Sequence, residues 1–200
     1  MTGKTHMSVG VGAATVLLPT NDMKTIFGGT ALALIGSLIV DIDTEKSGGS
    51  VMLKEAAAGA VILVALGIIL NDRYKINILK YIIGNKNLND MLPALGILTL
   101  ALIIGKFSSH RSFMHSIVGV IAFTVPAYML FGEVFCKWFF VGYVSHIAID
   151  MFNKKGVRLF YPLKSGVCLD MCKADGMADK ALFFMFIGVT ISKYITVITQ

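Results

Sequence analysis

The residues best suited to chemistry gather in one short polar stretch, His110-Arg111-Ser112-Phe113-Met114-His115-Ser116. Two of the chain's 4 histidines lie there beside an arginine, and long apolar runs flank the stretch on both sides. Polar side chains are costly close to a membrane and seldom accumulate there without a function. Because imidazole is the commonest metal ligand among side chains, the stretch indicates one half of a metal site.

Candidates for the other half occur near the ends of other apolar runs. His146 and Asp150 are four residues apart, a spacing that places both on one face of a helix. Such a pair shares a metal ion, or the aspartate orients the histidine; a structural hydrogen-bonded pair is the alternative. Asp41 and Asp43 follow the end of an earlier apolar run. They could bridge metal ions, or one could be a ligand and the other a general base. The alternative is a polar helix stop.

Mixed imidazole and carboxylate ligands favour zinc, manganese or iron over calcium and magnesium, which prefer oxygen ligands. The predicted metal ligands are His6, Asp41, Asp43, His110, His115, His146 and Asp150. Together they exceed what one tetrahedral ion needs, so we expect one or two ions, most simply zinc. Two ions would favour hydrolysis by a metal-bound hydroxide.

The predicted catalytic residues are Asp43, Arg111 and Arg158. A guanidinium binds phosphate in bidentate fashion, so both arginines are candidate clamps, although Arg158 is equally well explained as a headgroup anchor. His110 and His115 are five residues apart and cannot face the same way on one helix. We therefore expect His110 in a loop, Ser112 as the N-cap, and His115 in the first helical turn.

Composition predicts the class of protein. Apolar residues make up 56% of the 200 residues and charged residues 15%, against roughly 45–50% and about 25% in soluble domains. The mean hydropathy is +0.75. Continuous apolar runs indicate membrane helices rather than the alternating strands of a barrel. The net charge of +6 is spread between these runs, which argues against nucleic-acid binding.

Seven apolar runs divide the chain, which we interpret as one domain over residues 1–200. They cover residues 8–18, 26–40, 52–70, 91–104, 113–131, 135–149 and 181–198. Residues 76–83 form a candidate surface helix. Several runs fall short of the ~20 residues that span a bilayer. The prediction is an all-α, polytopic membrane bundle of six to seven short helices. The three cysteines show no zinc-binding spacing, and a Cys168–Cys172 bridge is left open.

Counting crossings brings the polar residues to one membrane face. If every run crosses, all 4 histidines, the Asp41/Asp43 pair and Asp150 lie on the side of the N-terminus. If the first run only lies on the surface, His6 is either on that side or lost from the site. An excess of lysine and arginine on this side favours a cytoplasmic orientation under the positive-inside rule.

The order of these motifs resembles the YdjM-like family. The resemblance extends from about His6 to Pro162 and includes Asp41-Ile42-Asp43, the His110–Ser116 stretch, His146-Ile147-Ala148-Ile149-Asp150, and the later Gly156-Val157-Arg158-Leu159-Phe160-Tyr161-Pro162. Members are described as inner-membrane, metal-dependent hydrolases, some of them linked to LexA binding. The family often has a histidine where this chain has Thr44, which removes one ligand or orienting group.

The resemblance and the residues together predict a membrane-embedded, metal-dependent hydrolase. We expect it to act on a phosphate ester, in a lipid or lipid-linked headgroup at the interface. A metal or proton transporter is the first alternative, because intramembrane histidine and aspartate also mark ion paths; the position of these residues at the ends of the runs argues against it. The second alternative is a membrane-tethered scaffold that binds a soluble partner through residues 151–180.

Overall fold

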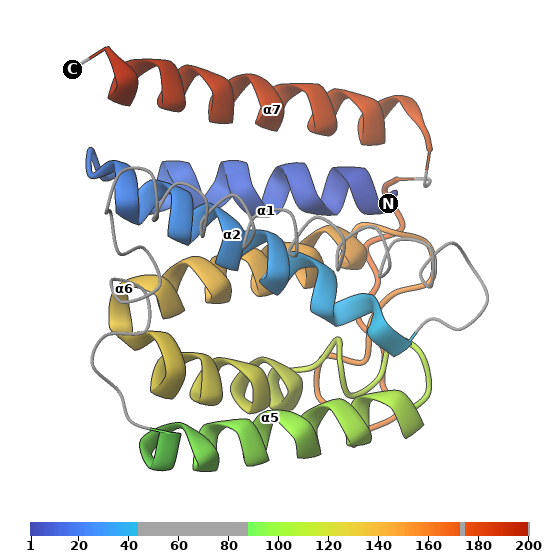
Figure 1. Cartoon of the computed structure of the whole chain (residues 1–200). Helices are drawn as coiled ribbons and strands as arrows, with labels where there is room; N and C mark the ends of the chain where they lie inside the picture. The colour runs from blue at the N-terminus through green and yellow to red at the C-terminus, as the bar shows by residue number, and fades with distance from the viewer. Residues whose placement is uncertain (44–87, 173–174, 200) are drawn as a thin grey trace.

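The computed structural model describes residues 1–43, 88–172 and 175–199 of the chain (Figure 1). In this part the regular secondary structure is helical, apart from two isolated β-bridges. The elements are α1 (Gly3–Leu17), α2 (Met23–Ile39), the 3-10 helix η1 (Val40–Asp43), α5 (Leu88–Phe107), α6 (Ile117–Met151) and α7 (Met177–Ile198). The predicted all-α class is confirmed. The predicted span 52–70 and the surface helix 76–83 lie outside the described residues.

Four helices in the described part are long and apolar enough to cross a membrane. They are Met23–Ile42, Asn89–Phe107, Ile117–Met151 and Met177–Ile198. Helix α1 has 15 residues, which at 1.5 Å each give about 22 Å, short of the ~30 Å hydrocarbon layer. With five α-helices and four candidate spans in the described ranges, the predicted count of six to seven helices is not supported.

Helix α6 is bent back on itself at one glycine. Gly132 has φ 79° and ψ −179°, a combination that is essentially restricted to glycine. The bend separates two arms, residues 117–131 and 133–151, which run in opposite directions (Figure 1). As a consequence, the beginning and the end of α6 lie at the same end of the bundle. The sequence placed two antiparallel helices here, over 113–131 and 135–149.

Small residues bring α2 and the second arm of α6 into backbone contact. A Cβ added at Gly36 would collide with the Phe139 carbonyl oxygen, and one added at Gly142 would collide with the Ala33 carbonyl. Membrane helices associate through such small residues because lipid offers no hydrophobic driving force between them. This close approach matters for the site, since Ser37 and His146 follow these glycines by one and four residues.

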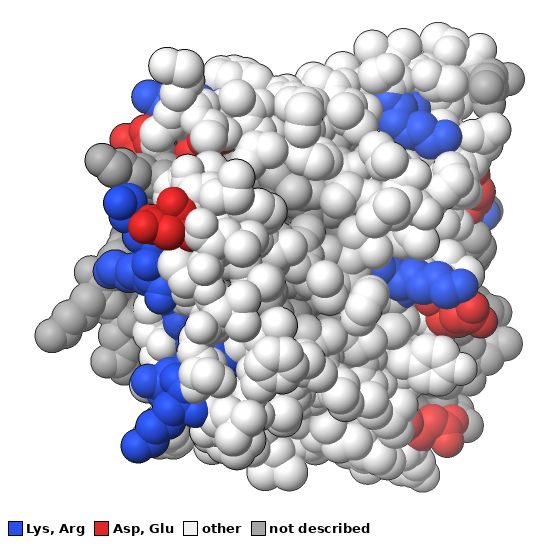
Figure 2. Space-filling view, turned by 180° about the vertical axis from the view of Figure 1, so that it is seen from behind, with Lys and Arg blue, Asp and Glu red and all other residues white. Residues whose placement is uncertain are grey.

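Charge and apolar surface are separated along the helix axes. In Figure 2 the charged side chains lie at two opposite edges, with a broad uncharged belt between them. The belt includes large apolar side chains that are exposed on several helices, for example Phe27, Leu100, Ile121 and Phe184. This distribution is the one that a bilayer requires of the helices that cross it.

Candidate metal centre at one end of the bundle

Five ionisable side chains from four segments converge at one end of the bundle. They are His6 of α1, Asp41 of η1, His115 of the loop before α6, and His146 and Asp150 of the second α6 arm. In Figure 1 the start of α1, the end of α2 and both ends of α6 lie on the same side. Alternating crossings of the apolar runs predict a common membrane face for these residues.

Each imidazole in the cluster faces a carboxylate through its Nε2 atom. His6 Nε2 is 3.3 Å from Asp150 Oδ1, and His115 Nε2 is 3.4 Å from Asp150 Oδ2. On the other side of the cluster, Asp41 Oδ1 lies 3.5 Å from His146 Nε2 and 3.7 Å from His115 Nε2. The rings of His6 and His146 are stacked, with centroids 3.8 Å apart.

These contacts form two overlapping groups of candidate ligands. One consists of His6, His146 and Asp150, and the other of Asp41, His115 and His146; within each group one ligand atom per residue lies within 4.8 Å of the others. His146 belongs to both. Two adjacent groups of this kind are compatible with one ion or with two, and in the second case His146 would ligate only one of the two ions.

Several buried polar atoms of the cluster have no hydrogen-bond partner among the described residues, as expected of ligands for a cation. They include His115 Nε2, His146 Nε2 and Asp150 Oδ1. The distances of 3.3–3.7 Å between the imidazole Nε2 atoms and the carboxylate oxygens exceed the roughly 2.9 Å of a usual N–H···O bond. A buried polar atom without a partner costs about 1–3 kcal/mol. Nitrogen lone pairs and carboxylate oxygens that converge in this way are what a divalent transition metal requires.

A backbone carbonyl sets the orientation of His146. Its Nδ1 lies 2.6 Å from the Ser37 carbonyl oxygen, and a carbonyl only accepts, so Nδ1 carries a proton. In the neutral ring, the lone pair is then on Nε2. Metal-binding histidines commonly have such a partner on the second nitrogen. Sequence reasoning missed Ser37, because the contact uses a backbone atom that any residue would supply.

His115 lies in the turn that precedes α6 and is fully buried. Burial lowers the pKa of its imidazole, with Asp150 acting in the opposite direction. A lowered pKa favours the neutral ring, which is the form that ligates a metal.

The start of α6 differs from the prediction, which made Ser112 the N-cap. Ser116 is the N-cap, its Oγ accepting from Gly119 N, and His115 precedes the helix. Ser112 instead closes a tight turn with its backbone N–H bonded to Ser109 O.

Arg111 lies beside the cluster and is bound on several sides. One guanidinium nitrogen is 3.1 Å from Asp150 Oδ2, and another donates to the Gly156 carbonyl at 3.2 Å. Its own carbonyl accepts from the backbone N–H of Arg158, which holds Arg111 in a left-handed conformation with φ 63°. Its Nε is buried without a hydrogen-bond partner among the described residues. Arg111 therefore places positive charge at the edge of the candidate metal centre.

The remaining predicted site residues lie at the margin. His110 is exposed and belongs to neither ligand group, but its ring meets that of His115 edge-on with centroids 5.5 Å apart. The Arg158 side chain is exposed, and the backbone N–H of Arg158 donates to the Arg111 carbonyl. Asp43 ends η1, and its side chain is outside the described part of the structure.

A bundle of apolar helices with a buried histidine and aspartate cluster at one end defines an integral membrane protein with a candidate metal centre. The family model of the YdjM inner membrane protein matches residues 1–198, so the chain belongs to that family. This match confirms the resemblance seen in the sequence and the inner-membrane assignment. Neither the curated proteins nor the solved structures gave a match.

Proposed function

We propose that this protein is a metal-dependent hydrolase that cleaves a phosphate ester at the membrane interface. The observation that supports it is the set of buried imidazole nitrogens that face two carboxylates without hydrogen-bonding them. The ligands are His6, Asp41, His115, His146 and Asp150, and their mixed character favours zinc, with manganese or iron as alternatives. An ion held there would activate water and polarise a phosphoryl oxygen.

The protein's own residues would then orient the substrate. Asp41 is the most accessible ligand, its side chain 30% exposed, so it marks the side from which substrate and water reach the cluster. Arg111 adjoins Asp150, where its guanidinium is suited to bind a phosphate oxygen and to stabilise developing negative charge. Arg158 is the second candidate clamp, and Asp43 the candidate base, from their places in the sequence.

The location of the cluster supports a substrate at headgroup depth. It lies at the ends of the candidate spans, next to a segment with exposed Lys154, Lys155, Arg158 and Lys164. A basic rim attracts an anionic phosphate ester more strongly than a neutral compound. The depth of the cluster favours an ester in a lipid or lipid-linked molecule. The described residues near the opposite end carry fewer basic groups, namely Lys24, Lys137 and Lys193. By the positive-inside rule the site would face the cytoplasm.

The test begins with metal analysis of the purified full-length protein in detergent. We expect stoichiometric metal in the wild type and its loss in His115→Ala and His146→Ala. His110→Ala is the matched control, because it removes a histidine that neither ligand group contains. Loss of metal in His110→Ala as well would make His110 a ligand, as the sequence predicted.

Activity is then measured on phosphomonoesters and phosphodiesters, both soluble and in lipid vesicles. Turnover in the wild type that disappears in both ligand variants supports the hydrolase. Wild-type protein without bound metal contradicts the proposal. Metal flux across vesicles without turnover of any ester would favour the transporter instead.

A further inference from the structure

A second buried carboxylate lies at the same end of the bundle, outside the candidate metal centre. Asp179, in the first turn of α7, is 2% exposed. Its Oδ1 and Oδ2 accept from the backbone N–H of Thr2 at 3.1 and 3.3 Å, and Oδ2 also accepts from Asp175 N at 3.2 Å. A buried carboxylate bonded to backbone N–H groups of two segments holds those segments together.

One of these segments is the helical turn that carries His6. Thr2 is the N-cap residue of α1 and makes no side-chain capping bond. Its carbonyl accepts from the backbone N–H of His6 at 3.1 Å and of Thr5 at 3.0 Å. In return, Thr5 Oγ1 donates to the backbone carbonyl of Asp179 at 3.3 Å. Asp179 is therefore joined to the first turn of α1 through both its side chain and its backbone.

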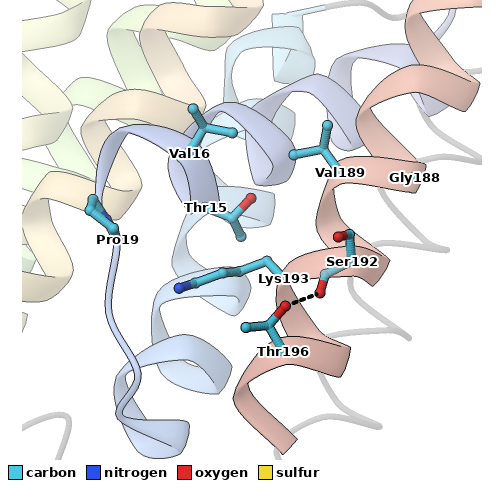
Figure 3. Close-up of a pocket in the computed structure, with 8 residues that line it drawn as sticks. All are labelled: Thr15, Val16, Pro19, Gly188, Val189, Ser192, Lys193 and Thr196. Atoms are coloured by element: carbon cyan, nitrogen blue, oxygen red, sulfur yellow. Dashed lines mark hydrogen bonds between the residues drawn. The ribbon is translucent and has the colours of Figure 1, made fainter. Parts of the chain in front are cut away.

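The other end of the α1–α7 pair is less closely packed. There a groove of about 500 Å³ opens between the two helices (Figure 3). It is lined by Thr15, Val16, Pro19, Gly188, Val189, Ser192, Lys193 and Thr196. Most of α7 faces outward, with only 6% of its candidate span buried. The bonds at Asp179 therefore join the start of α1 to α7, while Gly12 packs against Phe186 further along the pair.

We propose that Asp179 is a positioning residue for the metal centre, which acts by holding the first turn of α1 so that His6 meets Asp150. The inference rests on the proposed function in that it takes His6 as a ligand. His6 Nε2 lies 3.3 Å from Asp150 Oδ1, and its ring stacks on His146. A displacement of about 1 Å is enough to spoil ligand geometry at such a site.

The experiment measures cobalt(II) binding by the full-length protein in detergent, through both affinity and the visible ligand-field spectrum. We expect Asp179→Ala to weaken cobalt binding roughly 10–100-fold, the range typical when a group that orients a ligand is lost. Asp179→Asn keeps a carbonyl oxygen that accepts from Thr2 N–H and should retain most of the affinity. The matched control is Asp22→Ala, which removes the carboxylate that caps α2 near the opposite end of the bundle.

A double-mutant cycle separates positioning from general loosening of the fold. If Asp179 acts through His6, Asp179→Ala has no further effect on cobalt affinity or on the spectrum once His6→Ala is present. Its effect should instead persist in full in the Asp22→Ala background, since distant, independent sites give additive changes. Thermal unfolding of the metal-free proteins identifies a variant that fails to fold. If Asp179→Ala does so, Asp179→Glu, which keeps the carboxylate but lengthens the side chain by one methylene, replaces it in the cycle.

The outcomes distinguish this proposal from the hydrolase. Cobalt affinity in Asp179→Ala equal to that of the wild type overturns the positioning role and leaves the metal centre intact. An additive effect with His6→Ala, or an equal loss in Asp22→Ala, overturns it as well. Cobalt binding that depends on Asp179 through His6, without turnover of any ester, supports the positioning role and contradicts the hydrolase. A wild type that binds no cobalt overturns both.

Discussion

Gly36→Ala tests whether the contact between α2 and α6 orients the metal ligands. The added Cβ would collide with the Phe139 carbonyl oxygen and press on Tyr143 N. Both obstacles are backbone atoms, so no side chain can move aside. A carbon needs about 3.3 Å from a carbonyl oxygen, and the helices must therefore separate by about 1 Å. The Nδ1–O distance between His146 and Ser37 would grow from 2.6 Å to about 3.6 Å, beyond hydrogen-bonding range.

Two effects follow from this separation, one on stability and one on metal affinity. Overpacking in a close interface costs about 1–3 kcal/mol of folding free energy. Loss of the orienting carbonyl lowers metal affinity about 10–100-fold. Affinity is measured by competition with a chelator of known strength, and stability by thermal unfolding of the metal-free protein.

The control for Gly36→Ala is Gly96→Ala, because an added Cβ at Gly96 has no heavy atom within 4 Å among the described residues. Replacing glycine by alanine inside a helix is favourable by about 1 kcal/mol, so this variant should be no less stable than the wild type and should bind metal equally well. Metal affinity in Gly36→Ala that equals the Gly96→Ala value would refute the role of the Ser37 carbonyl.

Three further predictions concern the bend, the ion pair and the metal. Gly132→Ala should lose about 1–3 kcal/mol of stability from backbone strain, with unchanged metal affinity, because nothing described lies near the added Cβ; thermal unfolding and metal competition measure the two, and a wild-type melting temperature would contradict the strain. Asp150→Asn should abolish metal binding, since it removes a ligand and the Arg111 partner; retained metal in elemental analysis would exclude Asp150 as a ligand. Chelation should lower the unfolding free energy, by about 2.7 kcal/mol if free metal was at 100 times its Kd; unfolding curves that overlap with and without chelator would show that no ion stabilises the fold.

Much of the candidate site could be predicted because its residues follow regular patterns. The spacing of His146 and Asp150 predicts one helix face, and alternation of crossings predicts that His6, Asp41 and His115 share an end. The structure brings these five residues together. The apolar runs on either side of Gly132 also predicted two antiparallel helices, although not the form of the turn.

Other features depend on contacts that leave no pattern in the sequence. Ser37 takes part through its carbonyl, and Asp179 through backbone N–H groups far away in the chain. The start of α6 was predicted at Ser112, and serine is a suitable N-cap at Ser112 and at Ser116 alike. Ser116 is the cap, and the intervening residues form tight turns that bury His115. Helix number was predicted from apolar runs alone, and run length does not distinguish a crossing helix from a short buried one such as α1.

The bend at Gly132 also bears on how the site is assembled. Because α6 returns to its starting face, a single helical hairpin and the turn before it contribute His115, His146 and Asp150. The remaining two candidate ligands, His6 and Asp41, come from the pair α1 and α2 with η1. Membrane helices first insert and then associate, so the five candidate ligands meet only when these two hairpins have docked. Any ion bound by all five would link the two hairpins, and its binding free energy would oppose their separation within the bilayer.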